Sequence, residues 1–567
     1  MRAVGRDTPP LLQRGFLANA IHEVAVSIGP KDKAWLVGDK RFRADFPPEE
    51  KAHRLTVVFA EPDLLENPLY GTVTLNAIGA SNATVFRFRV NQAGSDIEAR
   101  ITVLYRGRIL QTALLRGQVF AATELVRLER SEPSPESPGI EVLVEAVLRP
   151  GLVGLDERTR FNAALVLNHD RAGRAGGTVF GKNRFEPFRL DWVGDAVREI
   201  SLTLERAEKD KAFGRRLDSN ESVSYLRNLA FQGVTLYQNV GMRVESAFGG
   251  KRLRRIQVVS ANPNTMLPVE MIYDLPPPVS EPKLCQNWTK ALATGRCEPG
   301  QFHTKNSEGL LDVVCPSGFW GVSKIIERWA VDPSRLVADP KTRGIDFAVL
   351  SVPHRERSTL GPLTPMLFAA SEHVNDAEPT ELVRVRKALE KLTNEQVDGV
   401  DTWHDWAGQV KVKGPHLLLL LSHTELNAPG GAALEIAKKG GPERRVVGQI
   451  TTAYVNVNRD RPGPIVMLLG CTTAVPLSNF QSFVVQFSNM GASLVVGTIA
   501  PVLGRHAGRA AEAIVEQLQA VSAAPRRSRR SMTFGEALLD IRRRLLANGI
   551  LMAMCLAAYG DADWRLP

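Results

Sequence analysis

One histidine and one cysteine in the C-terminal half have the residue types and spacing of a thiol-based catalytic pair. His423 follows the apolar run HLLLLLS, and Cys471, 48 positions later, follows the apolar run IVMLLG. A neighbouring imidazole can lower the pKa of a thiol and can later protonate a leaving amine. The pair therefore indicates nucleophilic catalysis by a thiol.

The same chemistry needs hydrogen-bond donors at the oxygen that becomes negative in the tetrahedral intermediate. We expect the backbone N–H groups of Thr424 and Cys471 to supply them. A nucleophile elbow of the α/β-hydrolase type is excluded, because Leu469 and Thr473 occupy its two glycine positions and because the histidine precedes the nucleophile.

Both residues stand directly after short apolar segments that read as buried strands, Leu417–Ser422 and Ile465–Gly470. In a parallel α/β sheet, the carboxyl ends of the strands line the crevice where ligands bind. The two side chains would meet there if the strands are neighbours. Further strands are expected at Ile256–Ser260, Phe347–Val352 and Leu494–Thr498, and helices at Thr380–Leu392, Ser478–Met490, His506–Ala520 and Phe534–Ala547. This alternation predicts a mostly parallel sheet with helices on both faces.

The first 170 residues have a different character, with short β-branched and aromatic segments that alternate in polarity. Strands are expected at Leu55–Ala60, Thr72–Asn76, Ala83–Val90, Glu98–Tyr105, Ile109–Leu115, Ile140–Leu148 and Phe161–Asn168. They predict a sandwich-like β-rich domain at 1–170 that docks or senses a partner. A mixed, helical connector at 171–254 and an α/β domain at 255–567, with a cysteine-containing insertion at about 280–330, complete the expected organisation.

Several sequence segments of the last 300 residues resemble segments of the CHAT domain and follow the same order along the chain. The CHAT domain is a bacterial family of caspase- and separase-related cysteine peptidases (clan CD). The matching segments are PVEMIYD at Pro268–Asp274, SHTE with His423, LLGCTTA with Cys471, GASLVVGTIAPVLGRHA, and FGEALLDIRRRL before AYGD. One position departs from the family, which usually has glycine after the catalytic histidine, where this chain has Thr424.

The resemblance implies a caspase-like endopeptidase that cleaves a partner protein without a catalytic cofactor. It also implies regulation by the N-terminal region or by an associated sensor protein, in a bacterial defence or cell-death pathway. The alternative is a catalytically inactive caspase-like scaffold, which Thr424 and the lack of an orienting acid would favour.

Four potential metal ligands, Cys285, Cys297, His303 and Cys315, fall within 31 residues of the insertion. Their types suit a structural Cys₃His zinc site, although the paired C-x-x-C spacing of such sites is absent. The alternative is that Phe319 and Trp320 anchor the insertion by hydrophobic contact.

An acidic residue could form the base of a substrate pocket that prefers a basic side chain. Asp274, Asp346 and Asp460 lie near expected sheet edges, and Asp460, before the strand of the cysteine, is the first choice. A solvated loop is the alternative for this residue.

Composition narrows the class of protein. The formal charge is +10, but the basic residues are dispersed, so direct contact with nucleic acid is not expected. Five scattered cysteines do not form a secreted disulfide framework. No apolar run reaches the roughly 18–20 residues that span a bilayer. A cytoplasmic protein without membrane contact is expected.

Overall fold

The computed structural model of the 567-residue chain describes residues 2–3, 15–29, 52–61, 64–76, 80–91, 93–129, 139–147, 159–169, 175–181, 184–190, 193–210, 216–249, 253–260, 267–298, 302–330, 338–339, 344–345, 360, 362–376, 379–397, 399–425, 428, 431–437, 443–457, 462–469, 477–499, 504–522 and 532–565. Several sequence predictions concern residues outside these ranges: Cys471, Asp346, Asp460 and the strand at Phe347–Val352.

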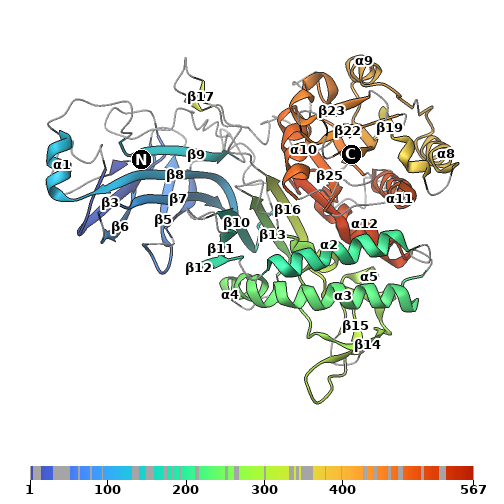
Figure 1. The fold of residues 1–567 in the computed structure, drawn as a ribbon, viewed down its shortest axis with the longest axis horizontal. Helices are drawn as coiled ribbons and strands as arrows, with labels where there is room; N and C mark the ends of the chain where they lie inside the picture. Colours follow the sequence, from blue (N-terminus) through green and yellow to red (C-terminus); the bar gives the residue numbers. More distant parts are fainter. Residues whose placement is uncertain are drawn as a thin grey trace.

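The N-terminal part is a β-sandwich, as predicted (Figure 1). One sheet has the order β2-β8-β7-β4-β5, with β9 on β8, and the other has the order β1-β3-β6. The elements are β1 (Arg2–Ala3), β2 (Phe16–Leu17), β3 (Ala20–Val26), β4 (Ala52–Ala60), β5 (Leu69–Asn76), β6 (Thr84–Val90), β7 (Asp96–Tyr105), β8 (Arg108–Phe120), α1 (Ala122–Glu129) and β9 (Glu141–Val147). Phe59 of the first sheet stacks on Phe86 and Phe88 of the second, so the two inner faces share one core.

A two-residue turn joins β7 to β8. Arg106 and Gly107 both have positive φ, 50° and 76°. Such a turn matches the twist of a hairpin. The start of β8 therefore lies next to the large ten-stranded sheet of the molecule.

Outside the sandwich, a large sheet has ten strands in the order β12-β11-β10-β13-β16-β26-β25-β24-β20-β19. The strands are β10 (Ala163–His169), β11 (Ala175–Phe180), β12 (Phe185–Arg189), β13 (Arg255–Ser260), β16 (Ile325–Ala330), β19 (Met366–Ala370), β20 (Leu417–Leu421), β24 (Ile465–Leu468), β25 (Leu494–Thr498) and β26 (Leu556–Gly560). Six of its nine pairings are parallel, which confirms the predicted mostly parallel sheet.

The antiparallel pairing of β25 with β26 divides this sheet into two halves. Strands β19, β20, β24 and β25 run in one direction, and β26, β16, β13 and β10 run in the other. Strands β10 to β12 belong to this sheet although the sequence analysis placed Phe161–Asn168 in the N-terminal domain. The functional division into three domains stays a prediction.

Helices surround the sheet (Figure 1). They are α2 (Gly194–Lys209), α3 (Asn220–Leu236), α4 (Met242–Phe248), α5 (Trp288–Thr294), α7 (Trp320–Ser323), α8 (Glu381–Thr393), α9 (Trp403–Lys413), α10 (Leu477–Asn489), α11 (Gly504–Ser522) and α12 (Phe534–Ala547). Successive strand side chains point to opposite faces, and all five residues of Leu417–Leu421 are fully buried. Both faces of β20 are therefore covered. Within the described part of the chain, none of the helices could span a bilayer.

Short elements complete the described chain. The pairs β14 (Pro278–Leu284) with β15 (Leu311–Val314), and β17 (Ala338–Asp339) with β18 (Gly344–Ile345), are two-stranded, and β21 (His423–Glu425), β22 (Ala433–Glu435) and β23 (Arg444–Val446) form a small sheet. A π-helical turn at Tyr237–Gly241 lies between α3 and α4, and short 3₁₀ helices lie at Val269–Met271, Pro316–Gly318, Glu372–Asn375, Val447–Gln449, Thr452–Tyr454 and Leu551–Cys555.

Candidate active site

The strands that precede the predicted catalytic residues are direct neighbours. β20 pairs with β24 in parallel, with Leu420 opposite Leu468, and the backbone N–H of Leu469 donates to the carbonyl of Leu420 at 2.9 Å. Their carboxyl ends lie at the same edge of the sheet, which is the condition under which the two side chains would meet. His423 follows this edge in the structure, whereas Cys471 lies outside the described residues, so the catalytic pair itself stays a prediction.

A third parallel strand brings a residue that the sequence analysis did not identify. β19 pairs with β20 on the side away from β24, and His373 follows β19 by three residues. Its ring stacks on the ring of His423, with 4.0 Å between the centroids and 27° between the planes. A histidine just after the apolar segment MLFAA is the sequence signal that could have predicted this contact.

Carboxylates surround His373. Its Nδ1 lies 3.0 Å from Oδ2 of Asp376, and its Nε2 lies 3.5 Å from Oε1 of Glu435. Glu435 is buried on β22, directly opposite His423 of β21. Arg444 on β23 pairs with both Glu435 (3.1 Å) and Glu425 (2.7 Å). The small sheet therefore places Glu425 and Glu435 near the two histidines, and Glu435 is an acid that the sequence analysis did not identify.

The surroundings of His423 keep its imidazole neutral. Burial lowers the pKa of His423, and the adjacent His373 lowers it further, against the opposing pull of Glu435 and Glu425. Its Nδ1 is buried and has no hydrogen-bond partner among the residues that the structure describes. A half-buried neutral imidazole with an uncommitted ring nitrogen has the properties of a general base.

Thr424, the residue in the place of the family's glycine, lies in strand β21 and is buried. It is not among the described residues with positive φ. Its backbone thus has an extended conformation that any L-residue can adopt, so the substitution requires no strain at this position.

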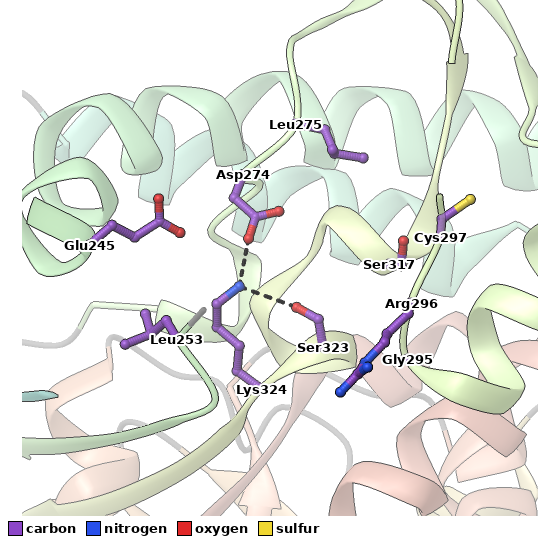
Figure 2. A pocket seen from close by; sticks show the side chains of 10 residues that line it. All are labelled: Glu245, Leu253, Asp274, Leu275, Gly295, Arg296, Cys297, Ser317, Ser323 and Lys324. Carbon is purple, nitrogen blue, oxygen red and sulfur yellow. Dashed lines mark hydrogen bonds and ion pairs between the residues drawn. The ribbon is translucent and has the colours of Figure 1, made fainter. Parts of the chain in front are cut away.

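The structure separates Asp274 from this edge. Asp274 accepts hydrogen bonds from Lys324 Nζ at 2.5 Å and from Trp320 Nε1 at 3.1 Å. It lines a cavity of about 240 Å³ together with Glu245, Leu253, Leu275, Gly295, Arg296, Cys297, Ser317, Ser323 and Lys324 (Figure 2). Lys324 immediately precedes β16, which lies four strands from β20, or about 19 Å at the usual strand spacing. Asp274 is therefore unsuited as the base of a pocket beside His423.

The four metal-ligand candidates do converge. One potential ligand atom from each of Cys285, Cys297, His303 and Cys315 lies within 4.8 Å of all the others. Cys285 Sγ is 3.8 Å from Cys297 Sγ and 3.5 Å from His303 Nε2. A hydrogen bond from the Cys315 thiol is the largest of the effects that lower the pKa of Cys285 to about 4. The residues therefore form a possible Cys₃His metal site, separate from the His423 edge.

Comparison with known proteins gives matches in structure only. No protein-family model matches the chain, and no curated protein sequence matches it. The Arg-specific cysteine proteinase gingipain R is similar with a TM-score of 0.31 and 10% identity, over 66% of this chain and 76% of that chain. Separase of Saccharomyces cerevisiae, in complex with securin, is similar with a TM-score of 0.34 and 9% identity, over 71% of this chain and 30% of that chain. TM-scores this low establish neither a shared fold nor a shared activity.

Proposed function

We propose that the protein is a caspase-like cysteine endopeptidase in which Cys471 is the nucleophile and His423 the general base and acid. The observation that carries this proposal is the parallel pairing of β20 with β24, because both strands end at one edge of the sheet and His423 and Cys471 follow them in the sequence. Only Gly470 separates Cys471 from Leu469, the last described residue after β24. The sequence resemblance to CHAT peptidases supports the same assignment.

In the proposed reaction, the neutral imidazole of His423 takes the thiol proton of Cys471. The sulfur attacks the carbonyl carbon of the scissile peptide bond, and the backbone N–H groups of Thr424 and Cys471 stabilise the oxyanion. The imidazolium then protonates the leaving amine, and a thioester remains. Water, deprotonated by the same imidazole, hydrolyses the thioester and restores the thiol.

The carboxylates near His373 favour the imidazolium that forms during this cycle. Glu435 and Glu425 both raise the pKa of His423, opposing burial. The result is a base that is neutral at rest and whose protonated form is stabilised when it appears. His373, Asp376 and Glu435 are positioning residues in this scheme, because they act on His423 and not on the substrate.

Substrate and regulation follow from the resemblance. We infer that a cytoplasmic partner protein is cleaved, that the N-terminal sandwich or an associated sensor protein controls cleavage, and that the pathway belongs to bacterial defence or cell death. Asp460 is the proposed acidic residue of the substrate pocket. A thiol–imidazole mechanism needs no metal, so an ion at the cysteine cluster would be structural.

The test is replacement of Cys471 by alanine in the full chain, co-expressed with the proteins of its native neighbourhood. Cleavage of a partner should be lost, while thermal unfolding stays unchanged. Cys555→Ala is the matched control, because Cys555 is a buried cysteine at the same edge of the sheet that has no role in the proposed reaction, and it should retain cleavage. Cleavage that survives Cys471→Ala would refute the proposal.

The scaffold alternative predicts a different result with a peptide that carries a thiol-directed electrophile. A peptidase should react selectively at Cys471, and His423→Ala should abolish the selectivity. A scaffold should show no His423 dependence. The extended conformation of Thr424 removes one of the two reasons for preferring the scaffold.

A further inference from the structure

Two parallel strands bring two cysteines of the cluster together. The spacing of the cysteines in the sequence does not predict this pairing. β14 and β15 pair with Leu284 opposite Val314, so the next residues, Cys285 and Cys315, lie side by side. The backbone N–H of Cys285 donates to the carbonyl of Val314 at 3.0 Å. The backbone N–H of Cys315 donates to the Tyr273 hydroxyl at 3.1 Å, which fixes this side of the cluster.

The other two residues approach from the loop after α5. A tetrahedral zinc ion with Zn–S bonds of about 2.3 Å and Zn–N bonds of about 2.0–2.1 Å separates two sulfurs by about 3.8 Å, and a sulfur from a nitrogen by about 3.5 Å. Cys285 lies 3.8 Å from the sulfur of Cys297 and 3.5 Å from Nε2 of His303. We propose that Cys285, Cys297, His303 and Cys315 bind one Zn²⁺ ion, and that the ion fastens the insertion to helix α12.

Leu292, Val314, Phe319 and Trp320 anchor part of the insertion in the main hydrophobic core, whereas the cysteines belong to a separate, small cluster. The cluster around the cysteines contains only four buried apolar residues, Cys285, Ala291, Val313 and Cys315. A two-stranded sheet is marginal in water, and small units of this kind are usually held by disulfides or a metal. Cys285, Cys297 and Cys315 form no disulfide, so a metal is the crosslink that these residues can supply.

The loop that carries Cys297 also contacts α12 from the other end of the chain. Gly295 ends α5 with φ of 66°, and a Cβ atom built there would lie 1.7 Å from the guanidinium of Arg543. Arg543 Nε in turn donates to the carbonyl of Val322 at 2.8 Å. A metal bound by Cys297 would therefore also fix the position of Gly295, against which Arg543 packs.

The centre is accessible to reagents. Cys297 is half-exposed and lines the cavity that also contains Asp274 and Lys324 (Figure 2). A chelator can therefore approach the site from this cavity without unfolding the insertion.

The first experiment measures the metal content of the full-length protein after dialysis, by mass spectrometry of the elements. The expected result is about one zinc ion per chain, falling below about 0.2 in Cys297→Ser and staying near one in Cys555→Ala. Wild-type protein from zinc-supplemented cells that contains no metal above background would overturn the proposal. Equal zinc in wild type and Cys297→Ser would overturn it too, because the ion would then be bound elsewhere.

Cobalt replacement tests the site in wild-type protein, in case the variant does not fold. Cobalt bound by three thiolates and an imidazole should give the intense thiolate-to-metal charge-transfer bands and the visible bands of tetrahedral Co²⁺. A spectrum without thiolate-to-cobalt bands would contradict the ligand set. Cys471→Ala should keep both zinc and cobalt, which separates this proposal from the peptidase assignment.

The fastening role is tested by hydrogen exchange and melting after zinc removal. Chelation confirmed by metal analysis should speed amide exchange in α5 and in the part of α12 near Arg543, and should lower Tm by about 5 °C or more, reversibly on adding zinc but not magnesium. Unchanged exchange in α12 after complete zinc removal would refute the fastening.

Discussion

Two buried polar clusters of this protein use charge in different ways. At the junction of the N-terminal sandwich with the ten-stranded sheet, Arg108 contacts the carboxylates of Glu327, Asp561 and Asp563, and its side chain is 2% exposed. His423 follows β20, four strands from β16; it is half-buried and its Nδ1 has no partner among the described residues. The first cluster pairs a buried cation with carboxylates, and the second leaves a proton acceptor without a partner among the described residues.

Glu327 makes several further hydrogen bonds in the Arg108 cluster. Besides Arg108, Glu327 accepts from Gln257 Nε2 at 2.8 Å, from Trp329 Nε1 at 2.9 Å and from the backbone N–H of Ala562 at 2.8 Å. Apolar residues of both sheets, including Val58, Leu104, Val166 and Val259, pack around the same junction. Buried polar and apolar contacts therefore join the sandwich to the sheet at this junction.

The largest effect is expected from breaking that junction. Arg108→Ala leaves three carboxylates without their shared cation and should lower the free energy of unfolding by about 3–5 kcal/mol, as measured by denaturant titration. Arg87→Ala is the matched control, because the Arg87 side chain is 62% exposed in its pair with Glu23, and it should cost no more than about 1 kcal/mol. Equal losses in the two variants would contradict the structural role of Arg108.

A smaller, specific effect is expected at the His423 edge. His373 lowers the pKa of His423, so His373→Asn should raise it. The base form of His423 is then reached at higher pH, and the acidic limb of the kcat/KM profile should move to higher pH with little change on the plateau. NMR titration of His423 reports the same shift without requiring activity.

Exposed His404 on α9 provides the control for that shift, and His404→Asn should leave the titration of His423 unchanged. A His423 pKa that stays constant or falls in His373→Asn would show that the stacked ring does not act electrostatically.

The smallest effect is expected at Thr424. Because Thr424 has an extended backbone, Thr424→Gly should not improve catalysis and should lower the free energy of unfolding by about 0.5–1 kcal/mol through the added chain entropy of glycine. Calorimetry and peptide cleavage check the two halves of this prediction. A large gain in activity would mean that the catalytic conformation needs glycine here.

Local patterns in the sequence were sufficient to predict the bounds of strands and helices that have a regular hydrophobic periodicity. The strand predicted at Leu494–Thr498 and the helix predicted at Phe534–Ala547 have those bounds in the structure. The capping box formed by Thr533 and Glu536 explains why the start of that helix is so well defined.

The sequence analysis did not predict strands whose charged residues pair with residues distant in the sequence. β16 has the sequence IIERWA, and Glu327 with Arg328 interrupts its apolar pattern. Both charges are buried because Arg108 and Glu270, remote in the chain, pair with them. Periodicity cannot predict such a strand, since its charges are compensated only in the folded protein.

The same limit applies to the two sites. His423 was predicted because it follows an apolar strand, but its contact with His373 depends on β19, which was not predicted. Likewise the cysteines lack C-x-x-C spacing, and it is the pairing of β14 with β15 that brings Cys285 beside Cys315. Residue types indicated the chemistry, and strand order, which spacing does not contain, determined the neighbours.

The central claim concerns the reactivity of Cys471 beside His423. The most direct measurement is the rate at which a peptide with a thiol-directed electrophile labels each cysteine of the full chain, read by mass spectrometry. The account predicts that Cys471 reacts much faster than Cys555, and that His423→Ala removes the difference. Labelling of Cys471 that is no faster than that of Cys555, or that is unchanged in His423→Ala, would contradict it.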